Sequence, residues 1–142
     1  MLALSAGCRS VDFNARVFHP WGCEDLEDAR AHFDAHKHVF MICIYEDQWQ
    51  DQGLNRYSLH HSKATVVRVY RGDWRISDRI AFVQGLDYPA LATTNANAGS
   101  LGFVFTDQHA DTEIGLDTGE FVHYRPELET ALDLVYPQSK SR

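Results

Sequence analysis

The residues best suited to metal or acid–base chemistry in this chain are histidines, of which there are eight. His32 and His36 stand four residues apart in a segment expected to be helical, and His60 and His61 precede an expected strand. Histidines at that helical spacing can chelate zinc, but two ligands leave a structural site incomplete and the chain has no HExxH motif. We therefore expect a solvated, histidine-rich face. A zinc-dependent activity that uses these histidines is the alternative.

The chain carries no motif for nucleophilic catalysis or phosphate binding. Neither GxSxG nor a GxxxxGK sequence followed by Ser or Thr occurs. The acidic pairs Asp47/Asp51 and Asp107/Asp111 are most simply explained as solvated charges of loops. We therefore expect a protein that is not an enzyme and uses no cofactor.

Two roles are expected for the cysteines. Cys8 follows a short run of small and apolar residues, which is typical of the segment before the lipidated cysteine of a bacterial lipoprotein, although no basic residues precede it. Residues 1–10 are thus interpreted as a truncated lipoprotein-signal-like segment, and the protein as lipid-anchored in the bacterial cell envelope. A soluble cytoplasmic form is the alternative. Cys23 and Cys43 could form one disulfide, or Cys43 could be a small buried hydrophobe.

The charge balance argues against nucleic acid as a partner. The net charge is −7 with histidine neutral, and the 13 Lys and Arg residues are scattered singly instead of forming a patch. The same balance disfavours adsorption to an anionic membrane surface, but it leaves a covalent lipid anchor open. A length of 142 residues with 44% hydrophobic content suits one globular domain.

Hydrophobic periodicity predicts a mainly β domain over residues 11–137, followed by a flexible tail at 138–142. The expected elements are a helix that ends near residue 37, a strand over 39–45, a hairpin over 64–84 with its turn at 71–73, strands over 101–106 and 120–124, and a helix beginning at Pro126. The run at 39–45 suits a strand buried on both faces or a buried helix segment, and its shortness favours the strand. Residues 46–56 are expected to be a long strand end or a loop, and residues 85–100 a long excursion.

Loose patterns in this order resemble the netrin-like domain family, which includes the tissue inhibitors of metalloproteinases. The resemblance is carried by Cys23, Phe33, the strand start at Val39-Phe40, the stretch from Val69 to Asp73, Ile80 and Phe82, and the stretch from Gly102 to Phe105. It implies a five-stranded OB-like β-barrel with an N-terminal and a C-terminal flanking helix. The inhibitors chelate the protease zinc through an N-terminal cysteine, whereas Cys23 lies well inside this chain. The resemblance therefore implies a fold and not protease inhibition.

The tripeptide Arg71-Gly72-Asp73 is one that integrins read, but glycine and aspartate are also what a turn requires. We expect a structural turn here, with Trp74 packed over the end of the barrel.

Barrels of this type often bind through one face and its flanking loops. The expected function is a non-enzymatic binding module that recognises a protein or an envelope component through residues 46–56 and 85–100. Trp49, Tyr57 and Tyr88 are the candidate binding residues, or each could instead be packing. A soluble acidic interaction protein of immunity type is the alternative.

Overall fold

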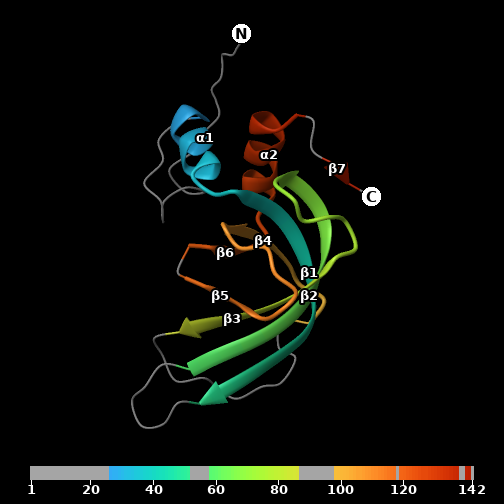
Figure 1. The fold of residues 1–142 in the computed structure, drawn as a ribbon. Helices are drawn as coiled ribbons and strands as arrows, with labels where there is room; N and C mark the ends of the chain where they lie inside the picture. Colours follow the sequence, from blue (N-terminus) through green and yellow to red (C-terminus); the bar gives the residue numbers. More distant parts are fainter. Residues whose placement is uncertain (1–25, 52–57, 87–97, 118, 138–139, 142) are drawn as a thin grey trace.

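The computed structural model describes residues 26–51, 58–86, 98–117, 119–137 and 140–141. Its elements are α1 (Leu26–Asp34), β1 (His38–Asp51), β2 (Ser58–Arg71), β3 (Arg79–Leu86), β4 (Leu101–Thr106), β5 (Ile114–Leu116), β6 (Phe121–His123), α2 (Pro126–Val135) and β7 (Lys140–Ser141) (Figure 1).

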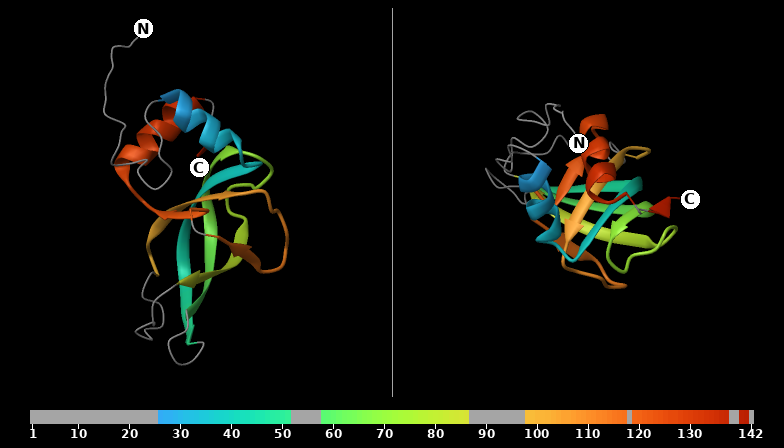
Figure 2. Two further views of the ribbon diagram at one scale, coloured as in Figure 1. Left: turned by 90° about the vertical axis from the view of Figure 1, so that its left-hand side faces the viewer. Right: turned by 90° about the horizontal axis from the view of Figure 1, so that it is seen from above.

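Six strands lie side by side in the order β5-β3-β2-β1-β4-β6. Neighbouring strands are antiparallel except β3 and β5, which are parallel, and β7 pairs with β2 near its end. The sheet curls into a half-barrel, and α1 and α2 lie next to each other over one end of it (Figure 1, Figure 2). The protein is therefore mainly β, as predicted, with a mixed sheet and two helices.

The two outermost strands of this path, β5 and β6, follow each other in the chain. Phe82 of β3 stacks on Phe121 of β6, with ring centroids 5.6 Å apart. Within the described residues, no backbone hydrogen-bond ladder joins β5 to β6. Aromatic side chains therefore span the opening of the half-barrel, because the sheet curls far enough to bring its two ends together.

Strand β1 contains an unbroken apolar run because both of its faces are buried. Val39 and Met41 belong to the core beneath the helices, whereas Phe40 and Ile42 belong to the core inside the half-barrel. Successive side chains of a strand point to opposite faces, so a strand covered on both sides reads as continuous apolar sequence. The core beneath the helices also contains Ala29, Phe33, Tyr70, Phe103, Phe105, Leu128, Ala131, Leu132 and Val135, and the interior core contains Ile44, Ala64, Val66, Trp74, Ile80, Phe82, Val104, Ile114 and Leu116.

Both helices are confirmed, and their predicted apolar faces lie on the sheet. Ala29 and Phe33 of α1 are fully buried. Pro126 occupies the first turn of α2, where its missing N–H leaves no hydrogen bond unmade. The two helices are linked where the Tyr136 hydroxyl donates a hydrogen bond of 2.7 Å to Asp34. Within the described residues, neither helix has the length and apolar character needed to cross a bilayer.

The hairpin over 64–84 forms, but the connection between its strands is longer than the turn predicted at 71–73. Strand β3 pairs only with residues 58–65 of β2, whereas residues 66–71 of β2 pair with β1 and β7. Residues 72–78 therefore make a long connection. The local pattern cannot show this, because the partner of the second half of β2 lies elsewhere in the chain.

Strand β5, the end of β1 and strand β7 are the other elements to compare with those expected from the sequence. Strand β5 is missed, because three residues in a polar connection carry too little pattern to be recognised. Residues 46–51 continue β1, so the strand end and not the loop is right for that part of 46–56. Lys140 and Ser141 form β7 in the segment expected to be a flexible tail.

Candidate functional site

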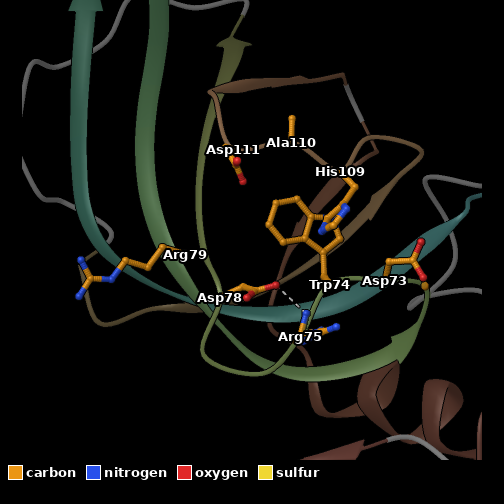
Figure 3. A pocket seen from close by; sticks show the side chains of 9 residues that line it. Asp73, Trp74, Arg75, Asp78, Arg79, His109, Ala110 and Asp111 are labelled. Carbon is orange, nitrogen blue, oxygen red and sulfur yellow. Dashed lines mark hydrogen bonds between the residues drawn. The ribbon is translucent and has the colours of Figure 1, made fainter.

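A surface pocket of about 750 Å³ lies between the β2–β3 and β4–β5 connections (Figure 3). We name it the Trp74 pocket. It is lined by Gly72, Asp73, Trp74, Arg75, Asp78, Arg79, His109, Ala110 and Asp111. Its walls come from loops, while the strands that carry those loops are held by the two cores.

Trp74 forms a rigid wall of the pocket. Its side chain is 4% exposed and its ring packs on Phe40 at 5.2 Å, within the core inside the half-barrel. The His109 and Trp74 rings pack edge to face, with their centroids 4.7 Å apart. The indole Nε1–H donates a 3.0 Å hydrogen bond to the carbonyl of Gln108. A buried tryptophan with its polar atom satisfied is held in one orientation.

Gln108 fixes the β4–β5 connection through hydrogen bonds to three different residues. Its carbonyl accepts from Trp74, its N–H donates to the Thr106 hydroxyl at 3.1 Å, and its side-chain amide donates to the Gly115 carbonyl at 2.8 Å. Two of these partners lie in the flanking strands β4 and β5. The loop that carries His109 and Asp111 is therefore preorganised.

The β2–β3 connection is held against the first residue of β1. Gly72 has a φ of +99°, and a Cβ at this position would overlap the ring nitrogen Nδ1 of His38. The next residue, Asp73, donates its backbone N–H to the same nitrogen at 3.0 Å. Glycine is required here both for its positive φ and for the close approach to His38. The Arg-Gly-Asp tripeptide is thus explained by backbone geometry.

The pocket lining carries three carboxylates, from Asp73, Asp78 and Asp111, and two guanidinium groups, from Arg75 and Arg79. Arg79 points away from it (Figure 3), with its guanidinium 6.0 Å from the Tyr45 ring. The Asp78 carboxylate accepts the N–H of Arg75 at 2.8 Å. Asp73 and Asp111 are exposed. Carboxylates beside an aromatic wall are suited to an ammonium or guanidinium group, through charge-assisted hydrogen bonds.

A second polar cluster lies inside the half-barrel. It follows a β-bulge in β1, after which successive side chains exchange the faces of the sheet to which they point. The register of β1 on β2 shifts between Ile44 and Glu46, so that Asp47 comes to lie opposite Ser62. Asp47 is fully buried, and its Oδ1 lies 2.5 Å from Nε2 of His60 and accepts the Ser62 hydroxyl at 3.0 Å. The expectation that Asp47 is a solvated loop charge is therefore wrong.

These three residues do not have the geometry of a nucleophilic triad. Ser62 donates to Asp47 and not to the imidazole of His60, so the histidine is not placed to take the serine proton. The shared acceptor instead satisfies two buried polar groups from the neighbouring strand. We interpret the cluster as a structural polar bridge between β1 and β2.

The expected histidine-rich face is only partly solvated. His32 of α1 and His36, which follows the end of α1, have ring centroids 5.8 Å apart, and both rings pack near Phe105. Burial, followed by the nearby His36, lowers the pKa of His32. His60 is buried, whereas His61 is half-buried and contacts Glu113 at 2.8 Å.

The histidines lie in separate places, since α1 precedes β1 whereas His60 pairs with residue 49 near the far end of β1. The residues that the structure describes contain no group of three or more His, Cys, Asp or Glu side chains able to hold a metal ion.

The other candidate residues are only partly covered. Trp49 lies in β1, paired in register with His60, while Tyr57 and Tyr88 lie outside the described residues. Cys43 is half-buried in β1 and forms no disulfide with another described residue. Its expected partner Cys23 lies outside the described residues, as does the lipidation candidate Cys8, so the disulfide and the anchor stay predictions.

Sequence reasoning missed the Trp74 pocket, because Asp73, His109 and Asp111 come from two connections far apart in the chain. The only local signal was the expected packing of Trp74. Comparison of the chain with protein-family models, with curated proteins and with solved structures found no match.

Proposed function

We propose that the protein is a non-enzymatic, OB-like binding module of the bacterial envelope that captures a basic side chain of a protein partner in the Trp74 pocket. The observation that carries this function is the preorganised pocket, in which Trp74 and His109 form a fixed wall beside the exposed carboxylates of Asp73 and Asp111. Loops at the end of a curled sheet are a common binding position in OB-type barrels.

In the proposed OB-like barrel the five strands would be β1, β2, β3, β4 and β6. The proposed partner group is cationic because Asp73 and Asp111, two of the three carboxylates that line the pocket, are exposed, while Arg79 points away from it (Figure 3). A lysine ammonium or an arginine guanidinium would donate to these oxygens while its alkyl stem lies on the aromatic wall. The net charge of −7 would also speed the approach of a basic partner.

Binding is tested with the peptide acetyl-GKGKG-amide and its acidic counterpart acetyl-GEGEG-amide, by calorimetry at low salt. We expect the basic peptide alone to bind, and Asp73→Asn combined with Asp111→Asn to weaken its Kd about tenfold, which corresponds to ~1.4 kcal/mol. The Asn at position 73 keeps the backbone N–H that bonds His38.

Asp117→Asn is the matched control, because Asp117 is an exposed aspartate of the β5–β6 connection outside the pocket. It removes one carboxylate charge, as each of the two pocket substitutions does, and should leave the affinity nearly unchanged. Equal binding by the double variant and the unchanged protein would place the peptide elsewhere and refute this use of the pocket.

In this function the chain is held at the envelope by a lipid on Cys8. Mass spectrometry of the N-terminal peptide from the native organism is expected to find a chain that begins at Cys8 with a diacylglyceryl adduct on its thiol. An unmodified cysteine preceded by the residues from Met1 onward would contradict the anchor. It would leave the pocket function intact and favour the cytoplasmic alternative.

A further inference from the structure

The contact between His38 and the β2–β3 connection requires a particular protonation state. Nδ1 of His38 accepts the Asp73 N–H at 3.0 Å, and the side chain is 5% exposed. A ring nitrogen can accept only when it carries no proton, so the imidazole is neutral with its proton on Nε2. In the imidazolium form both nitrogens are donors. Two N–H groups would then face each other, and the contact would be lost.

The surroundings of His38 leave little room for local adjustment. Gly72 lies so close to the ring that even a Cβ would overlap Nδ1, so the connection cannot shift toward β1. His109 lies on another side, with ring centroids 5.7 Å apart, and it also contacts Trp74. A change at His38 therefore reaches both loops that form the Trp74 pocket.

The charged and titratable groups around His38 favour its neutral form on balance. Burial lowers the pKa of His38 most, His109 and Lys37 lower it further, and the carboxylates of Asp73 and Asp107 raise it. The net pKa lies below the usual 6.5. The folded state thus binds fewer protons at His38 than the unfolded state. The stability from this contact is present above pH 6.5 and is lost as the pH falls through the lowered pKa.

We propose that protonation of His38 is an acid switch that releases residues 72–74 and lowers the affinity of the Trp74 pocket for a basic partner. The affinity part of this switch rests on the function proposed above, whereas the release of the loop does not. In neutral conditions the pocket is assembled, and in acid the segment that carries Asp73 and Trp74 moves away from β1.

The switch is tested in the full chain by amide hydrogen exchange followed by NMR at pH 7.5 and at an acidic pH below the midpoint of the His38 ring titration, with rates corrected for intrinsic exchange. We expect the protection of the Asp73 amide, relative to Val104 in β4, to fall at least tenfold in acid. The reference amide is needed because burial also lowers the pKa of His32 and His123, so global stability decreases in acid as well. The midpoint should coincide with the NMR titration of the His38 ring.

Two variants separate His38 from its neighbour. His38→Asn keeps an acceptor oxygen near the position of Nδ1 at every pH, so it should remove the acid response. His109→Gln should retain it. Protection of Asp73 that is equal at both pH values in the unchanged protein, or lost at a midpoint other than that of His38, would overturn the switch whether or not the variants fold.

The affinity arm uses acetyl-GKGKG-amide, whose charge is the same at both pH values. We expect its Kd to weaken at least fivefold at the acidic pH in the unchanged protein, but not in His38→Asn. If Asp73 loses protection while the peptide binds at neither pH, the switch stands and the proposed function fails. If the peptide binds equally at both pH values, control of the pocket by His38 is refuted and its binding function stands.

Discussion

Replacement of Asp47 by alanine is expected to lower the free energy of unfolding by about 1–3 kcal/mol for each of the two buried polar groups that lose it as an acceptor. The carboxylate is fully buried and is shared by His60, at 2.5 Å, and by the Ser62 hydroxyl, at 3.0 Å. Alanine removes the acceptor from both groups, and neither can reach bulk water without opening the sheet. The measurement is urea unfolding followed by circular dichroism.

Glu46→Ala is the matched control for this substitution, because the neighbouring carboxylate lies in the same strand but is 39% exposed and 3.7 Å from Lys63. Its cost should be at most ~1 kcal/mol, as for an exposed ion pair. The combination of Asp47→Ala with Ser62→Ala should cost less than the sum of the single changes, since the two groups share one hydrogen bond. Equal costs for Glu46→Ala and Asp47→Ala would show that the buried bridge does not stabilise β1 on β2.

Phe33→Ala is expected to cost about 3–5 kcal/mol, as for other fully buried phenylalanines. The Phe33 ring stacks on Phe105 of β4 at 5.6 Å and lies 6.4 Å from the Tyr136 ring, so it joins α1 to the sheet and to the end of α2. Its removal leaves a cavity that a helix of nine residues cannot close without moving. Urea unfolding should give a lower midpoint, and hydrogen exchange should show faster opening of α1 than of β4.

The exposed Leu134 of α2 provides the control for Phe33. Its side chain is 52% exposed, and Leu134→Ala should change the free energy of unfolding by less than ~0.5 kcal/mol. A loss from Phe33→Ala as small as that from Leu134→Ala would mean that α1 is not held through this ring.

Elements whose burial follows a single local period could be read from the sequence. Strand β4 has the bounds expected for it, and α2 begins at Pro126 with its predicted face of Leu128, Ala131, Leu132 and Val135 buried. In both cases the residues that make the pattern also make the contacts. Strand β1 could be read for a similar reason, because a run covered on both faces needs no particular partner to be recognised as buried.

The site depended on pairing between distant segments. Because of the extra residue at the bulge of β1, the Asp47 side chain points into the half-barrel instead of outward. The sequence of residues 44–47 does not predict this bulge. The β2–β3 connection is long because β3 pairs with β2 only as far as Thr65, whereas β1 pairs with β2 as far as Arg71. Both features are set by register, which is a property of two strands together.

The sequence by itself determined a mainly β chain with two amphipathic helices, a strand buried on both faces and a glycine turn beside a packing tryptophan. Only the tertiary structure decided that Gly72 must admit the His38 ring, and that Asp73 and Asp111 meet at one pocket. Apolar periodicity is a local property that any buried face imposes on its own residues. A pocket is made by groups that become neighbours only after the sheet has curled, and no local pattern encodes that distance.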